Sequence, residues 1–235
     1  MTEALYQTDA YLKEFDAVVT AVDGNRVALD RTAFYPGGGG QHNDVGTLTA
    51  HGETWHVLKA SKQGAEVWHE LDRAAPPRGT PVRGAIDWVR RYQLMRTHTA
   101  MHILCGVIFR DYGASVTGGN MEPLKGRMDF EFETMRQEFV KQIEEKINAE
   151  VAQARPTRVN SLPRADAFQI PDLIRTKINL LPDGILEVRT VEIEGLDLQA
   201  DGGTHVANTR EVGRIRVVDY KSKGKINKRI EVAVE

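Results

Sequence analysis

Residues 96–104 read RTHTAMHIL, a stretch without proline or glycine that predicts a helix. His98 and His102 are four residues apart, so on a helix their imidazoles lie on the same face, one above the other. Two neighbouring imidazoles suit a transition metal ion. Because apolar residues continue beyond Gly106, we expect this helix to reach about Tyr112.

A third imidazole comes from residues 201–205, which read DGGTH. Glycines allow such a loop to approach a ligand closely, so His205 is a candidate third metal ligand. Asp201 is a candidate fourth ligand or an anchor for a water, although an aspartate before glycines also forms turns. Cys105, the only cysteine, is the rival ligand, although a free cysteine is more often simply buried.

The pair of histidines is not the metalloprotease motif His-Glu-x-x-His. Thr99 stands where that motif has its glutamate base. Any hydrolysis at this site must therefore activate its water differently.

The composition is that of an ordinary soluble globular protein. Of the 235 residues, 41% are hydrophobic and 27% are charged, and the net charge is −2. A single cysteine fits a reducing compartment, and we find neither a signal-peptide pattern nor an apolar run long enough to cross a membrane. We therefore expect a soluble, cytoplasmic protein.

The N-terminal third is rich in strand patterns. Short apolar or alternating runs separated by turns predict strands at 15–22, 26–30, 45–50, 53–60 and 65–70. Strands at this spacing favour a small sheet or barrel. Three prolines and a glycine in 74–81 mark a boundary, so we expect a first domain at 1–81 and a second at 82–235.

The second domain mixes helices with strands. The sequence predicts strands at 128–133, 185–193, 214–220 and 228–234. It predicts a helix from Thr134 to Pro156 and a shorter helical region over 166–179, with a break at Pro171. Thr134 to Gln137 match a capping box, and residues 117–120, which read TGGN, predict a glycine turn.

The last two strands flank a basic segment. Residues 210–235 carry eight Lys/Arg against four Asp/Glu, and no acid lies between Tyr220 and Glu231. Such a run can neutralise phosphates, or it can be the solvated tip of a hairpin. Its members are Lys221, Lys223, Lys225, Lys228 and Arg229.

A second glycine-rich loop lies in the first domain, where residues 34–41 read FYPGGGGQ. It lacks the Lys-Ser/Thr of a phosphate-binding loop and the spacing of a dinucleotide-binding loop. A loop whose backbone amides meet a ligand or another domain is the better interpretation.

Together, the His98–His102 pair, the stretch from Gly202 to Gly213 and the FYPGGGGQ loop resemble the editing region of alanyl-tRNA synthetase. More closely, the chain resembles the free-standing AlaX proteins, in their medium-length form AlaX-M, over nearly its whole length. The resemblance implies hydrolysis in trans of tRNA(Ala) wrongly charged with serine or glycine, with Zn²⁺ as cofactor. It also implies the fold class α+β, in which a small N-terminal β-barrel is followed by an α+β editing domain with a mixed or antiparallel sheet packed on helices.

The resemblance assigns roles to individual residues. His98, His102 and His205 match the zinc histidines, and Asp201 stands where many members have cysteine. Because a carboxylate is a harder ligand than a thiolate, we expect zinc to be bound less tightly here than in those members. Gln41, Thr97 and Thr99 are candidates for contacting the serine hydroxyl, and the basic hairpin would hold the phosphates of the tRNA acceptor stem.

Two other functions fit parts of the pattern. A metallohydrolase of a small ester or amide would act without tRNA and would ignore the basic segment. A non-enzymatic RNA-binding module with structural histidines would bind tRNA in the presence of a chelator and would not deacylate it. We expect no obligate protein partner.

Overall fold

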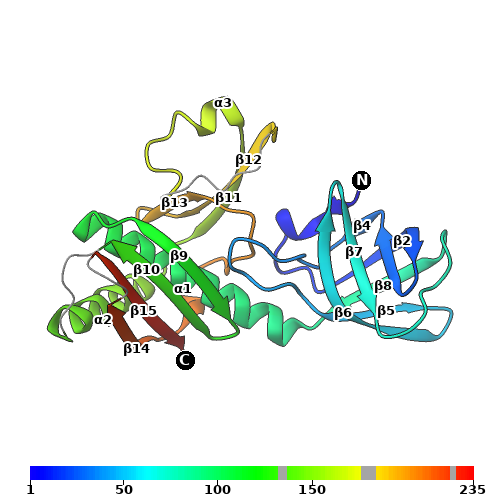
Figure 1. The fold of residues 1–235 in the computed structure, drawn as a ribbon, viewed down its shortest axis with the longest axis horizontal. Helices are drawn as coiled ribbons and strands as arrows, with labels where there is room; N and C mark the ends of the chain where they lie inside the picture. Colours follow the sequence, from blue (N-terminus) through cyan, green and yellow to red (C-terminus); the bar gives the residue numbers. More distant parts are fainter. Residues whose placement is uncertain (132–136, 176–183, 223–225) are drawn as a thin grey trace. The chain divides into compact units, whose positions relative to one another are not determined.

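The chain forms two compact units in a computed structural model, Met1–Gln93 and Leu94–Glu235, and the residues described are 1–131, 137–175, 184–222 and 226–235 (Figure 1). The division falls inside helix α1 (Trp88–Tyr112) rather than at the proline-rich segment, because strand β8 (Pro81–Ile86) belongs to the first unit. No helix in the described residues is both long enough and apolar enough to span a membrane.

The N-terminal unit is a closed antiparallel barrel with the strand order β2-β3-β7-β6-β5-β8. All five strands expected in this region are present, and β8 completes the barrel. The elements of the unit before β8 are β1 (Glu3–Ala4), η1 (Leu5–Gln7), β2 (Glu14–Asp23), β3 (Arg26–Leu29), β4 (Arg31–Thr32), β5 (Gly46–Ala50), β6 (Glu53–Gln63) and β7 (Glu66–Leu71).

Alternating burial along the strands builds the barrel core. In β7 every second side chain points inward, as the period-2 pattern predicts. The fully buried core includes Phe34, Leu48 and Leu71. Closure removes the open edges that a sheet of this size would otherwise expose.

A buried ion pair holds the segment that leads into the FYPGGGGQ loop. Arg91, at the start of α1, is fully buried and pairs with Asp44, and its Nη2 donates to the backbone oxygen of Ala33 at 2.6 Å. Oδ2 of Asp44, the oxygen that pairs with Nη2 of Arg91, also accepts the Tyr35 N–H at 2.6 Å. Gln41 closes the loop through backbone hydrogen bonds with Gly38 and is itself buried.

The C-terminal unit contains two antiparallel sheets and the larger part of α1. One sheet has the order β14-β15-β10-β9 and the other β11-β12-β13. The elements after α1 are β9 (Val116–Glu122), β10 (Lys125–Glu131), α2 (Gln137–Ala152), β11 (Thr157–Pro163), α3 (Arg164–Ala167), β12 (Glu187–Ile193), β13 (Asp197–Ala200), η2 (Thr209–Val212), β14 (Ile215–Ser222) and β15 (Asn227–Val234).

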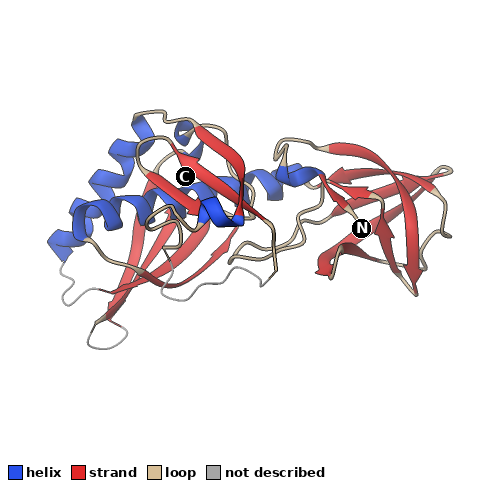
Figure 2. Ribbon diagram, turned by 90° about the horizontal axis from the view of Figure 1, so that it is seen from above, coloured by secondary structure: helices blue, strands red, loops and turns tan. Residues whose placement is uncertain are grey.

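Both long helices pack beside the four-stranded sheet (Figures 1 and 2). Gly126 of β10 lets α1 approach closely, since a Cβ there would lie 2.4 Å from the Met101 sulfur. Asn148 of α2 donates to the backbone oxygen of Ile215 in β14 at 2.7 Å. Both helices therefore contact strands of this sheet.

Two expectations were wrong in this unit. Residues 117–120 lie in strand β9, where Gly119 pairs with Met128, rather than in a turn. In the helical region expected over 166–179, with a break at Pro171, the described residues are helical only in the four-residue α3, because the chain turns after it and Asp172 adopts φ +57°, outside the helical region. Residues 176–183 and most of the capping box expected at Thr134 lie outside the described residues.

Candidate metal centre

Helix α1 carries two of the four clustered side chains, as its spacing predicts. His98 and His102 project from the same face of α1, and both are buried. The helix ends at Tyr112 with Gly113 in the left-handed region (φ +63°). The ring centroids of His98 and His102 are 5.1 Å apart, so the helix alone positions two imidazoles as neighbours.

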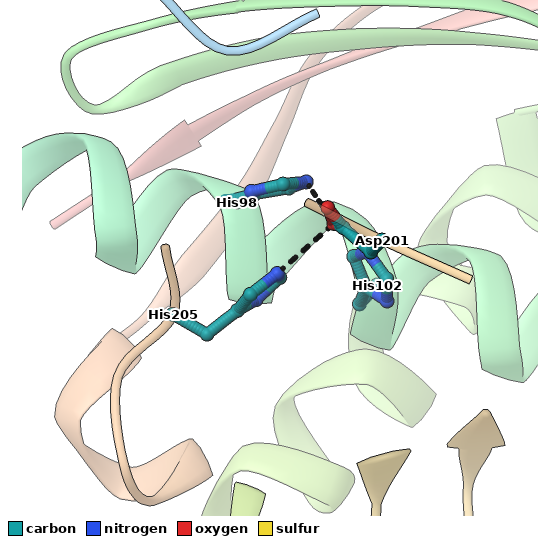
Figure 3. Close-up of side chains that lie close together, drawn as sticks. All are labelled: His98, His102, Asp201 and His205. Carbon is teal, nitrogen blue, oxygen red and sulfur yellow. Dashed lines mark hydrogen bonds and ion pairs between the residues drawn. The ribbon is translucent and has the colours of Figure 1, made fainter. Parts of the chain in front are cut away.

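The loop after β13 supplies the other two side chains. His205 stacks on His98 with ring centroids 4.1 Å apart, and Asp201 lies against all three imidazoles (Figure 3). One potential ligand atom from each of His98, His102, Asp201 and His205 lies within 4.8 Å of the others. The structure thus brings together the four residues that the sequence predicted as metal ligands.

The carboxylate of Asp201 serves two purposes through its two oxygens. Oδ1 accepts the Gly203 N–H at 2.6 Å, which is the turn expected of an aspartate before glycines. Oδ2 faces the imidazoles, 3.2 Å from Nε2 of His98, 3.2 Å from Nε2 of His205 and 3.5 Å from Nε2 of His102. Both interpretations of Asp201 are therefore compatible, because each uses a different oxygen.

These separations fit a metal ion held by the four side chains. Ligand atoms about 2.1 Å from a tetrahedral zinc ion lie roughly 3.4 Å from one another. The distances from Asp201 Oδ2 to the three imidazole nitrogens, 3.2 to 3.5 Å, match that spacing. Three imidazoles with one carboxylate are a donor set that zinc accepts.

The electrostatics of the cluster also suit a cation. Burial lowers the pKa of His98 well below its usual value and lowers the pKa of His205 to about 4, so both rings are neutral at pH 7. Burial raises the pKa of Asp201, but the electrostatic interaction with His98 and hydrogen bonds from His102 and His205 outweigh it and hold that pKa well below its usual value. Neutral imidazoles and an ionised carboxylate are the forms that bind metal.

His102 differs from the other two imidazoles. Burial lowers its pKa, but hydrogen bonds to Asp197 and Asp201 outweigh burial and raise the pKa to about 9. Without metal this ring is therefore protonated on both nitrogens at pH 7, and a metal ion held at Nε2 would require the loss of the proton there.

Thr97 and Thr99 are fully buried, and their hydroxyls have partners within the protein. Thr99 Oγ1 accepts the Val206 N–H at 3.2 Å and lies 3.2 Å from Nδ1 of His205. Thr97 Oγ1 accepts the Leu124 N–H at 2.9 Å. Both threonines therefore connect α1 to neighbouring segments, and their contact with a substrate hydroxyl stays a prediction.

Gln41 belongs to the N-terminal unit, so its part in the site also stays a prediction. Cys105 is buried, which raises the pKa of its thiol strongly, and Asp201 rather than this thiol completes the cluster among the described residues. A buried, protonated thiol behaves as a small apolar side chain.

The basic segment is less uniform than its sequence indicates. Lys228 is buried in β15, and Arg229 donates two hydrogen bonds to Asp129, at 2.7 and 2.8 Å. Lys221 is half-exposed and pairs with Asp219 at 2.7 Å. Lys223 and Lys225 lie outside the described residues.

Two residues beside the cluster were missed from the sequence. Asp197 accepts a hydrogen bond from His102, and Arg189 donates to the backbone oxygen of Asp201 at 2.8 Å. The signal for Asp197 was present, because Asp197 and Gln199 occupy alternate positions in an otherwise apolar strand and so share one face. No feature of the sequence distinguishes Arg189 from the many other arginines of the chain.

Known proteins resemble the chain over its whole length. It is 40% identical over 240 residues to the alanyl-tRNA editing protein AlaX-M of Saccharolobus solfataricus, with 100% of both chains covered. It is 39% identical to the AlaX-M protein of Methanosarcina barkeri, with 98% of both chains covered. It is also 40% identical to the alanine–tRNA ligase of Ignicoccus hospitalis, covering 94% of this chain but 24% of the ligase.

Two family descriptions match separate parts of the chain. Residues 188–231 match the threonyl and alanyl tRNA synthetase second additional domain, and residues 4–90 match the class II (A) tRNA synthetases. The first match includes Asp201 and His205, and the second covers most of the N-terminal unit. Because relatives of this similarity span its full length, the chain belongs to the AlaX-M family of alanyl-tRNA editing proteins.

Proposed function

We propose that the chain is a zinc-dependent deacylase that hydrolyses, in trans, the ester of tRNA(Ala) mischarged with serine or glycine. The observation that carries this proposal is the convergence of three imidazoles and the Asp201 carboxylate within 4.8 Å, in a chain of the alanyl-tRNA editing family. The substrate makes this a protein of translation.

The chemistry required is modest. An aminoacyl ester is already activated towards hydrolysis, so a strong nucleophile is unnecessary. A bound Zn²⁺ supplies a Lewis acid that lowers the pKa of water or that binds the α-amino group of the amino acid. His98, His102, His205 and Asp201 would hold the ion.

Selection of serine over alanine needs a polar contact for a single hydroxyl. A site that hydrogen-bonds that hydroxyl discriminates strongly against a substrate lacking it. We propose Gln41 for this contact, and Thr97 as a second candidate. For Thr99, the hydrogen bonds to His205 and Val206 support a different role, in which it orients His205.

We propose that the hairpin of β14 and β15 contacts the phosphates of the acceptor stem. Lys221, Lys223 and Lys225 are its best candidates, since Lys228 is buried and Arg229 is paired with Asp129. Such contacts position the tRNA without reading its sequence.

Removal and restoration of metal test the proposal. Purified protein is assayed for serine release from seryl-tRNA(Ala) as prepared, after stripping with a chelator and after addition of Zn²⁺. We expect activity to disappear on stripping and to return with zinc. Persistent activity in protein shown to be free of metal would refute metal dependence.

The same assay addresses the two alternatives. Hydrolysis of a small serine ester as fast as seryl-tRNA(Ala) would favour a general esterase. Binding of tRNA without any release of serine, with metal present, would favour a non-enzymatic RNA-binding module.

A further inference from the structure

A second buried carboxylate lies behind the metal cluster. Asp197, in β13, is 3% exposed, and its Oδ2 lies 2.9 Å from Nδ1 of His102. The same oxygen accepts a hydrogen bond from Nε2 of Gln199 at 2.7 Å. Asp197 therefore contacts the side of the His102 ring that faces away from Asp201.

This contact determines which nitrogen of His102 is available. An ionised carboxylate can only accept hydrogen bonds, so Nδ1 of His102 must donate its proton to Asp197. In the neutral ring the lone pair is then on Nε2, the nitrogen 3.5 Å from Oδ2 of Asp201. The imidazole is oriented with its free nitrogen toward the other candidate ligands.

A buried cation supports the charge on Asp197. Nε of Arg175 lies 3.7 Å from Oδ1 of Asp197, and its guanidinium lies 3.6 Å from the centre of the Phe109 ring. A carboxylate without a nearby cation would be costly at this depth. Arg175 thus places a positive charge beside Oδ1 of Asp197, while Oδ2 receives the hydrogen bonds from His102 and Gln199.

The backbone also makes room for this contact. Gly106, one turn beyond His102 on α1, faces β13, and a Cβ added there would lie 3.0 Å from the Cβ of Asp197. Because glycine occupies this position, the strand approaches the helix closely enough for the carboxylate to reach the imidazole.

We propose that Asp197 is a positioning residue that fixes the tautomer and orientation of His102 for metal binding, with Gln199 and Arg175 holding Asp197 in place. The inference rests on the metal site of the proposed function. It assigns the affinity for the ion partly to a residue that does not itself touch the ion. Outer partners of metal-bound histidines typically contribute roughly 10- to 100-fold in metal affinity.

The test compares Asp197→Asn with the unmodified protein. Affinity for Zn²⁺ is measured by competition with a chromophoric chelator, and the visible spectrum of the Co²⁺-loaded protein reports ligand geometry. Asparagine keeps the shape but loses the charge and can turn a donor toward Nδ1. We expect zinc affinity to fall roughly 10- to 100-fold and the cobalt spectrum to change.

Glu150→Gln is the matched control. Glu150 is a buried acid of the same unit whose carboxylate pairs with Arg110 at 2.6 Å and Arg155 at 2.7 Å, away from the four clustered residues. We expect this change to lower thermal stability without altering zinc affinity. If Glu150→Gln reduced zinc affinity as much as Asp197→Asn, the effect would be general destabilisation and the inference would be overturned.

If Asp197→Asn does not fold, Gln199→Met serves instead. It removes one of the two hydrogen bonds to Oδ2 of Asp197 and leaves the carboxylate in place, so we expect a loss of a few-fold in zinc affinity. Wild-type zinc affinity and an unchanged cobalt spectrum in whichever folded variant is tested would overturn the inference.

The assay separates this inference from the proposed function because it needs no tRNA. A wild-type protein that binds zinc but does not release serine would refute the deacylase, while loss of affinity in the Asp197 variant would still support the positioning role. A wild-type protein that binds neither Zn²⁺ nor Co²⁺ would overturn the inference itself.

Discussion

At the scale of single residues, the candidate metal centre depends on side chains whose two polar atoms have separate tasks. Asp201 uses one oxygen to form its turn and the other to face the imidazoles. His205 turns Nδ1 to Thr99 and Nε2 to Asp201. A substitution that keeps only one of these two atoms loses the task of the other.

Asp201 provides a direct test of the ligand set. Loss of a residue that contacts a metal ligand typically lowers metal affinity roughly 10- to 100-fold. Because Asp201→Ala removes a ligand itself, we expect zinc affinity to fall by at least as much. In Asp201→Cys we expect zinc to be retained, since a thiolate is a favourable zinc ligand. The zinc content of each variant after dialysis against a chelator measures how well it retains the ion. Unchanged retention in Asp201→Ala would show that Asp201 is not a ligand.

Thr99 tests how His205 is held. Thr99→Val preserves volume but leaves the buried Val206 N–H without its acceptor, so we expect a loss of about 1–3 kcal/mol in stability. We also expect weaker zinc binding, because His205 loses a partner. Thr99→Ser keeps the hydroxyl and should restore both quantities. A valine variant that destabilises the protein but binds zinc normally would assign Thr99 a purely structural role.

At the scale of elements, the barrel contains a buried histidine that makes its stability sensitive to pH. His69 of β7 is fully buried, with Nε2 2.9 Å from Oγ1 of Thr32 and Nδ1 3.3 Å from the backbone oxygen of Val27. Burial lowers its pKa from 6.5 to about 4, although the hydrogen bond to Val27 partly opposes this.

The sign of the pH effect follows from that depressed pKa. Between pH 6.5 and 4 the unfolded chain holds a proton on His69 that the folded barrel lacks, so stability falls on acidification. From pH 7 to pH 5 we expect the free energy of unfolding of the N-terminal unit to fall by about 2 kcal/mol through His69. All three tryptophans, Trp55, Trp68 and Trp88, lie in the N-terminal unit, so their fluorescence follows its unfolding by urea.

Variants isolate this contribution. His69→Gln should reduce the pH dependence of unfolding by that amount, while His56→Gln, at an exposed position of β6, should leave it unchanged. Equal pH dependence in His69→Gln and the unmodified protein would contradict this account.

In the hairpin of β14 and β15 we expect Lys221 to contribute to tRNA binding and Arg229 to contribute to stability. Lys221→Ala removes an exposed ion pair, so we expect stability to stay nearly unchanged but tRNA binding to weaken, with a smaller salt dependence. Arg229→Ala removes both hydrogen bonds to Asp129, so we expect a loss of about 1.5–3 kcal/mol in stability. Filter binding at several salt concentrations, together with thermal unfolding, measures both. Unchanged tRNA affinity and salt dependence in Lys221→Ala would remove Lys221 from the tRNA contact.

At the scale of the whole molecule, the sequence predicted structure that depends on neighbouring residues better than contacts between residues far apart in the chain. The barrel strands follow from alternation and turns, and the two imidazoles of α1 follow from helical spacing. Strands β11 and β13 were not predicted. β11 is largely exposed and β13 is only four residues long, so neither shows a clear period.

The site was predictable only where residues belong to a motif. His98, His102, Asp201 and His205 lie in two short stretches whose resemblance to a family is specific. Asp197 acquires its role only when β13 packs on α1 at Gly106, a contact between residues far apart in sequence. The pairing of Arg229 in β15 with Asp129 in β10 could not be predicted from the sequence for the same reason.

The central claim is selective removal of the wrong amino acid. The most direct measurement is the rate of amino-acid release from seryl-tRNA(Ala) and from alanyl-tRNA(Ala), under the same conditions with zinc present. We predict rapid release of serine with alanine retained, at a ratio that a hydroxyl-binding site can raise to roughly 10⁴. Equal release from both, or release from neither, would contradict the account.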